Sequence, residues 1–261
     1  MTIVKHELRQ GRTAFLIWCG AIAALLGICI FLFPEMKAEM DTVSEMFASM
    51  GAFTAAFGMD KLNFGTLTGY YAIECGNVLG LGGAFYAAII AADVLCKEER
   101  MHTADFLLTH PVSRTQVMTE KLASVLIRLA VLNALIYGIA VLSMTAVGEE
   151  VPWKELNLMH LAYFLLQLEL AGLCFGISAF LRRSSVSIGL GIAILMYFMN
   201  LIANITESAK DLKYLTPFGF CDGAAIVSEG RLDGGILAAG MALGALGILA
   251  AYLKYPKKDI Q

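Results

Sequence analysis

Charged residues are scarce in this sequence. They make up 16% of the 261 residues, against about 25% in a typical soluble domain, while hydrophobic residues make up 58%. The formal net charge of -3 excludes a strongly basic nucleic-acid-binding protein. Because apolar stretches occupy most of the length, the composition predicts a single membrane domain over residues 1–261, surrounded by lipid.

Motifs that carry catalysis are also missing. No Gly-Lys dipeptide occurs, so the chain has no Walker A loop and ATP has to be bound elsewhere. No H-E-x-x-H zinc motif and no G-x-S-x-G nucleophile motif occurs. The six cysteines form no C-x-x-C pair, and most lie in apolar stretches, so we expect buried thiols rather than disulfides. We therefore expect no catalytic, cofactor-binding or metal-binding residue in this chain.

Long apolar stretches are what the sequence has in abundance. A bilayer core takes about 20 helical residues to cross, and the backbone amides of a span have to be hydrogen-bonded within it. The sequence therefore predicts an all-α integral membrane protein with six transmembrane helices. Their expected bounds are residues 13–33, 71–96, 122–147, 158–181, 186–205 and 234–253.

Lys and Arg are distributed unevenly between the two sides of these spans. Most of those outside the spans lie on the side that receives both termini and the 97–121 segment between spans two and three. Because loops rich in Lys and Arg stay in the cytoplasm, we expect both termini to be cytoplasmic in a multi-pass protein.

The segments outside the spans have helical patterns of their own. In residues 1–12, Ile3, Val4 and Leu8 share one side, and the basic residues can face lipid headgroups, which predicts a short amphipathic helix. In residues 34–69, apolar residues recur at helical spacing between 40 and 50, which predicts a surface helix followed by a break at residues 58–60. Residues 206–233 contain Pro and Gly and should form short helices and turns.

Four charged residues fall within predicted spans: Glu74, Asp93, Arg128 and Glu169. The last three need partners or water. Asp93 and Arg128 lie near the cytoplasmic ends of spans two and three. We hypothesise that they pair; the alternative is that each reaches the surface separately. Glu169 lies near the bilayer centre, and it could line a translocation path, face an interface or stay protonated. We expect a water-accessible or interface position for it.

Glycines also recur at a spacing that allows helices to approach closely. We expect these G-x-x-x-G runs to serve packing within the chain rather than a dimer contact. They are Gly76/Gly80, Gly172/Gly176 and Gly240/Gly244.

The 97–121 segment, KEERMHTADFLLTHPVSRTQVMTEK, predicts a helix, a turn and a second helix. Thr103 can cap a short helix that Pro111 ends, and Ser113 can cap the helix of span three. The apolar side chains of residues 106–108 then need burial. The residues alone leave two possibilities open: burial against the chain's own bundle, or burial in a groove of a partner.

Several stretches, in the right order, resemble the ABC-2 type permeases, the membrane subunits of ATP-binding-cassette exporters. They are KHELRQGRTAFLIW (5–18), FGMDKLNFGTLTGYYAIE (57–74), KEERMHTADFLLTHPVSR (97–114) with EKL at 120–122, and YLTPF (214–218). His102-Thr103 stands where family members usually have Gly-Thr.

The resemblance implies more than spacing does. Such permeases pair as homodimers or heterodimers, and each copy docks on an ATPase subunit, which holds ATP and Mg. The loop after span two acts as a cytoplasmic coupling helix in a groove of the ATPase, and the N-terminal helix also contacts that subunit. The ATPase-facing residues that the resemblance implies are Glu98, Glu99, Thr103, Phe106, Leu107, Leu108, Pro111, Ser113 and Arg114.

The function that we expect is that of a permease subunit of an ABC exporter in a bacterial cytoplasmic membrane. It would contact lipid and would move a substrate whose class the sequence does not identify. Two alternatives come from other classes. One is a membrane-embedded enzyme that uses Glu169 or Asp93 in acid–base chemistry. The other is a sensory or scaffold subunit that binds an ATPase and transports nothing.

Overall fold

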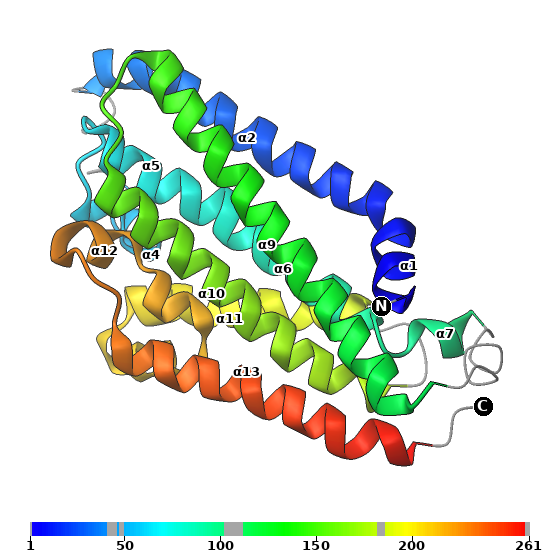
Figure 1. Ribbon diagram of the computed structural model, residues 1–261. Helices are drawn as coiled ribbons and strands as arrows, with labels where there is room; N and C mark the ends of the chain where they lie inside the picture. Colours follow the sequence, from blue (N-terminus) through cyan, green and yellow to red (C-terminus); the bar gives the residue numbers. More distant parts are fainter. Residues whose placement is uncertain (1, 41–45, 47–49, 102–111, 182–185, 259–261) are drawn as a thin grey trace.

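The computed structural model describes residues 2–40, 46, 50–101, 112–181 and 186–258, and these contain helices but no strand (Figure 1). Six helical segments are long and apolar enough to cross a membrane, as predicted. They are α2 (Arg12–Ala38), the second span (Leu67–Asp93), α9 (Arg114–Val147), α10 (Trp153–Ser178), α11 (Val186–Ile205) and α13 (Gly234–Lys254).

Two of the differences from the predicted bounds lie at ends that hydrophobicity does not set. The first span continues through Pro34 as far as Ala38. The third begins at Arg114, well before its apolar run, because the Ser113 side chain accepts a hydrogen bond from the Gln116 backbone N–H at 3.1 Å. This confirms that Ser113 caps the helix.

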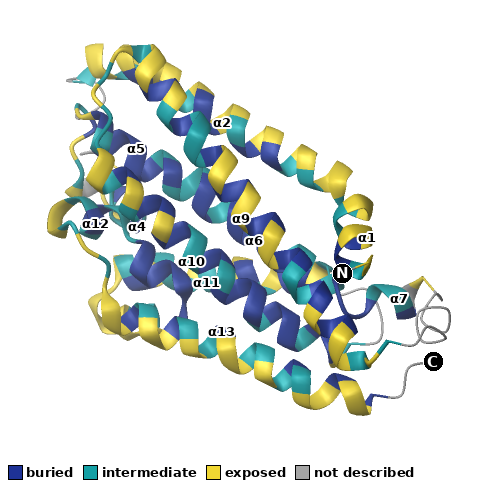
Figure 2. Ribbon diagram, in the orientation of Figure 1, coloured by how far each residue is buried: buried dark blue, intermediate teal, exposed yellow. Residues whose placement is uncertain are grey.

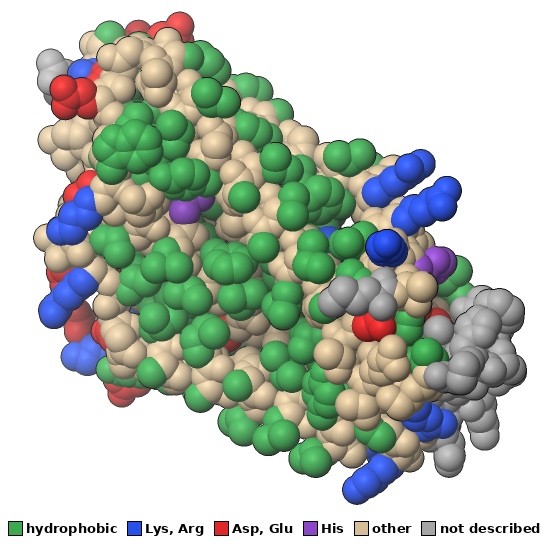
Figure 3. All heavy atoms as spheres, in the orientation of Figure 1, with side chains coloured by type: hydrophobic (Ala, Val, Ile, Leu, Met, Phe, Trp, Pro, Cys, Tyr) green, Lys and Arg blue, Asp and Glu red, His purple; other side chains and the backbone are tan. Residues whose placement is uncertain are grey.

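Helix α10 lies at the centre of the bundle, in contact with α13, α6 (Gly82–Asp93) and α9. It is largely buried, whereas α2 and α13 present exposed faces (Figure 2). Apolar side chains cover the middle of the surface, and charged side chains gather at its two ends (Figure 3). An apolar belt between charged ends is the surface that a bilayer requires.

Helices α10 and α13 touch along their backbones. A Cβ atom at Gly172 would lie 2.5 Å from the carbonyl oxygen of Gly244, and one at Gly176 would lie 2.5 Å from that of Gly247. Because a larger residue at either position would separate the helices, these glycine runs serve packing within the chain, as predicted.

The second span has an interruption that the sequence did not reveal. It consists of α5 (Leu67–Cys75), the π-helix η2 (Gly76–Leu81) and α6. The Tyr163 ring of α10 packs against η2, where a Cβ at Gly80 would lie 2.9 Å from its Cε1 atom. Tyr163 thus fills the space that the glycines leave, so the Gly76/Gly80 run also packs within the chain.

Short helices cover the end of the bundle opposite the termini. They are α4 (Ala52–Ala56), η1 (Met59–Lys61), η3 (Glu207–Leu215), η4 (Pro217–Cys221) and α12 (Gly223–Glu229). Gly58 has a positive φ of 68°, which confirms the break predicted at residues 58–60. The helices η3, η4 and α12 confirm the short helices predicted in residues 206–233. Most of the helix predicted between 40 and 50 lies outside the described residues.

All six cysteines are free thiols, and all but Cys29 are buried, as expected. Burial raises the pKa of the Cys221 thiol, in η4, well above its ordinary value. A thiol that stays protonated is a poor nucleophile, so this cysteine packs as a small apolar residue.

Candidate functional site

Helix α1 (Thr2–Gln10) lies at the end of the bundle that holds both termini, packed against the start of α9 (Figure 1). Its pattern is amphipathic, as predicted: Val4 is buried, and Lys5 and Arg9 are exposed. The carboxylate of Glu120, on α9, accepts hydrogen bonds from the backbone N–H groups of Ile3 and Val4, at 3.1 and 3.3 Å. A carboxylate at this position satisfies the unpaired amides of the first helical turn and complements the helix dipole.

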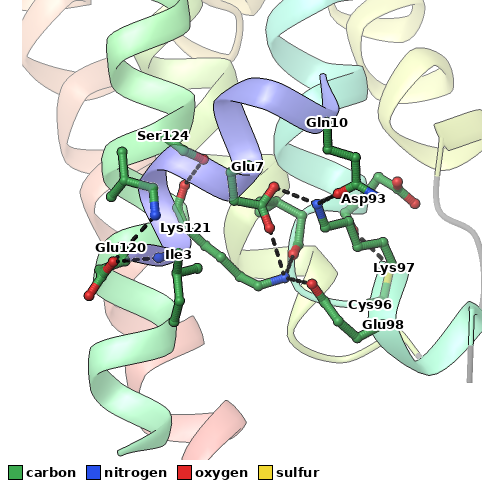
Figure 4. A network of polar contacts seen from close by, with 12 residues as sticks. Ile3, Glu7, Gln10, Asp93, Cys96, Lys97, Glu98, Glu120, Lys121 and Ser124 are labelled. Atoms are coloured by element: carbon green, nitrogen blue, oxygen red, sulfur yellow. Dashed lines mark hydrogen bonds and ion pairs between the residues drawn. The ribbon is translucent and has the colours of Figure 1, made fainter. Parts of the chain in front are cut away.

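Glu7 is the acidic residue on the buried side of α1, and it is only 2% exposed. Its carboxylate pairs with the ammonium of Lys97, at the start of α7 (Lys97–Arg100), and lies 3.6 Å from that of Lys121, on α9 (Figure 4). It also lies 4.0 Å from the guanidinium of Arg128. One carboxylate therefore connects α1 with the end of the second span and the start of the third.

Lys121 is a fully buried cation. Its side chain is 0% exposed, and its ammonium donates to the backbone carbonyl of Val94 at 2.5 Å and to the carboxylate of Glu98. A buried charge is tolerated when it has partners of opposite charge and hydrogen bonds, and here Glu7 and Glu98 provide the charge. We call Glu7, Lys97, Glu98, Glu120, Lys121 and Arg128 the anchor cluster.

The guanidinium of Arg128 lies against the corner between α1 and α2. Its Nη2 donates to the backbone carbonyl of Glu7, and a Cβ atom at Gly11 would lie 2.6 Å from that nitrogen. Gly11 is therefore the small residue that lets the guanidinium approach the backbone. In this geometry Arg128 interacts with Glu7. Asp93 lines the same cavity, of about 270 Å³, as Glu7, Lys97 and Arg128, and its pairing with Arg128 stays a prediction.

The anchor cluster was missed because Glu7 was not singled out in the sequence. The sequence nevertheless contains a pattern that points to Glu7. Ile3, Val4, Glu7 and Leu8 follow the i, i+1, i+4, i+5 spacing of one helical face, so Glu7 falls among the apolar residues. A carboxylate on the apolar face of an amphipathic helix requires a buried cation.

Four of the residues that the resemblance implied to face an ATPase are described, and all four contact the chain itself. Glu98 belongs to the anchor cluster, and Ser113 caps α9. Glu99 pairs with Lys258 at 2.6 Å, and Arg114 Nη1 donates to the carbonyl oxygen of Lys258, also at 2.6 Å. These contacts fix the two ends of the segment between them. The other five, Thr103, Phe106, Leu107, Leu108 and Pro111, lie outside the described residues.

Glu169 occupies the contact between α10 and α13. It is 2% exposed, which does not agree with a water-accessible position, and its carboxyl group lies against Gly240. Neither carboxyl oxygen has a hydrogen-bond partner among the described residues. The absence of a side chain at Gly240 leaves the room that the carboxyl group occupies, so Glu169 faces an interface, but one within the chain.

Two further polar pairs join the spans inside the bundle. The Tyr71 hydroxyl lies 2.7 Å from Nε2 of His160, and the Asn133 amide donates to Oε1 of Gln167 at 2.6 Å. Polar contacts of this kind between membrane helices are worth about 1 kcal/mol each. They join helix α10 to α5 and α9.

The architecture defines a multi-pass α-helical membrane protein with a buried ionic cluster at the end that holds both termini. A family model described as ABC-2 family transporter protein matches residues 1–219, which include α1, the anchor cluster and the first five spans. The chain therefore belongs to the ABC-2 family of transporter proteins and is a membrane subunit of an ABC transporter. A comparison with curated proteins found no match.

Proposed function

We propose that this chain is the permease subunit of an ABC exporter in a bacterial cytoplasmic membrane. It moves a substrate, so far unidentified, with ATP that a separate Mg-dependent ATPase subunit hydrolyses. The observation that carries the proposal is the anchor cluster, which joins both ends of the 97–121 segment to α1 and to spans two and three.

The cluster supports a lever mechanism. Lys97 precedes the segment that docks on the ATPase and Lys121 follows it, and both interact with the Glu7 carboxylate. When ATP binding closes the ATPases, the docked segment moves, and the buried ion pairs make both of its ends move together with α1. Spans two and three continue directly from these ends, so the motion reaches the bundle. Transport then requires a substrate cavity whose affinity differs between the two states.

Two features of the chain support contact with the ATPase. The apolar side chains of Phe106, Leu107 and Leu108 suit a groove on a partner. The exposed basic side chains of α1, Lys5 and Arg9, lie on the helix that packs against the start of α9. A second permease copy would cover part of the apolar belt, and lipid would cover the rest.

Co-purification with a candidate ABC ATPase subunit, co-expressed with this chain, tests the docking. Leu107→Asp combined with Leu108→Asp should abolish co-purification, because two carboxylates cannot enter an apolar groove without a large desolvation cost. Met101→Asp is the matched control, since it places the same charge on a neighbouring exposed apolar residue outside the docking set. Retained binding by the double variant would contradict the docking proposal.

The response of the ATPase rate to added compounds distinguishes an exporter from a scaffold subunit. The intact complex in vesicles is screened against a compound panel of peptides, antibiotics, lipids and ions. An exporter responds to at least one class with a faster ATPase rate, and a scaffold responds to none.

A further inference from the structure

The segment that follows α13 returns to the anchored end of the bundle. It forms the short helix η5 (Tyr255–Lys257), in which the Tyr255 side chain is buried. The Lys258 backbone N–H donates to the Tyr255 carbonyl at 3.1 Å, and this turn directs Lys258 into the protein. Its neighbour Lys257 is exposed, whereas Lys258 is only 6% exposed. A lysine is rarely buried unless it is paired.

Lys258 is paired, and its partners lie in helix α7 and in the segment that follows α10. Its ammonium lies 2.6 Å from Oε1 of Glu99, at the beginning of the docking segment (residues 98–120), and donates to the carbonyl of Leu181, after α10, at 2.6 Å. The Glu99 side chain is 6% exposed, so the ion pair is shielded from water on both sides. Lys258 therefore connects the beginning of the docking segment with the end of span four.

Residues 255–258 also contact the other end of the docking segment. Arg114, the first residue of α9, donates from Nη1 to the backbone carbonyls of Pro256 at 3.1 Å and Lys258 at 2.6 Å. Residues 255–258 thus contact the chain just before residue 102 and just after residue 111. The contacts are independent of the anchor cluster, since none of them involves Glu7, Lys97 or Lys121.

From this geometry we infer that residues 255–258 are a second clamp on the ATPase-docking segment, with Lys258 as its positioning residue. The inference rests on the proposed function, because the clamp acts on a segment whose role is proposed above. The anchor cluster ties that segment to α1 and spans two and three. The clamp ties it to spans four and six, so a movement of the docked segment is passed to both halves of the bundle.

Hydrogen exchange on the full-length permease in lipid nanodiscs, without any ATPase, tests the clamp itself. Lys258→Met should raise the exchange rate of peptides covering residues 97–101 and 113–117 by about tenfold, because local opening becomes easier when buried contacts are lost. Lys257→Met, a change at the exposed neighbour, should leave both peptides unchanged. Glu99→Gln removes the same ion pair from the other side and should reproduce the effect, and Lys258→Arg should preserve protection.

The complex with the ATPase tests transmission. Trapping with ATP and vanadate should change exchange in α10 and α13 of the wild type, and the change should be at least about twofold smaller in Lys258→Met with trapping itself retained. A wild-type chain that fails to co-purify with the ATPase contradicts the proposed function. Unchanged exchange in Lys258→Met and Glu99→Gln in the permease alone overturns the clamp, whatever the ATPase does.

Discussion

Glu7→Gln keeps the size of the side chain at the centre of the anchor cluster and removes its charge. Lys97 then loses its ion pair with Glu7, and Lys121 keeps Glu98 and the Val94 carbonyl but loses its second carboxylate. The glutamine amide can still accept one hydrogen bond. The cluster would carry an uncompensated positive charge, with Lys121 fully buried.

The size of the effect follows from the burial of the two lysines. Removing one partner of a buried ion pair costs about 3–5 kcal/mol. Because Lys121 retains partners and the Lys97 side chain is 12% exposed, the lower end applies, about 3 kcal/mol. A loss of this size lowers the ratio of folded to unfolded protein on the order of a hundredfold, a large part of the stability of a typical domain.

The assay is reversible unfolding of the purified chain in mixed micelles, followed by tryptophan fluorescence. The control is Glu35→Gln, the same change at an exposed position on α2. Adding Lys97→Met to Glu7→Gln should recover part of the loss, because it removes the cation that Glu7 no longer pairs. Equal stability of Glu7→Gln and Glu35→Gln would refute the reasoning that the cluster is buried and mutually dependent.

Two predictions concern glycines and share the control Gly20→Ala, since a Cβ at Gly20 would meet nothing within 4 Å. Gly11→Ala should displace the Arg128 guanidinium, 2.6 Å from the new Cβ, and lower stability by about 1–3 kcal/mol. Limited proteolysis should then cut earlier near α1. Gly172→Ala should cost at least as much, because the atom it meets, the Gly244 carbonyl oxygen at 2.5 Å, belongs to the backbone and cannot rotate away. Its measured outcome is a lower yield of folded protein, and a yield equal to that of Gly20→Ala would contradict the close α10–α13 contact.

Local patterns predicted the spans well because each span is decided by local physics. A run of apolar residues as long as a bilayer is thick has to be helical, whatever the rest of the chain does. The Ser113 cap of α9 was predicted for the same kind of reason, since it bonds an amide three residues away, although the span itself was expected to begin at residue 122. The break at Gly58 likewise depends on one residue's backbone freedom.

The positions of the charged residues could not be predicted so well. Asp93 and Arg128 were matched to each other because they lie at similar depths on consecutive spans, but depth along a helix says nothing about the direction of a side chain. Arg128 reaches Glu7, across a separation of 121 residues, and its pairing with Asp93 stays a prediction. Glu169 was expected at a water-accessible or interface position, and it lies buried against α13 because Gly240 leaves room for it there.

The sequence by itself determined six apolar helices, the ends that local caps fix, the amphipathic α1 and the family resemblance that the family match confirms. Each of these depends on hydrophobicity or on neighbours within a few residues. Only the tertiary structure decided the anchor cluster, the 255–258 clamp, the π-helix and the site of Glu169. Those depend on which helix faces meet, and a buried charge finds its partner among residues that folding brings together from distant parts of the chain.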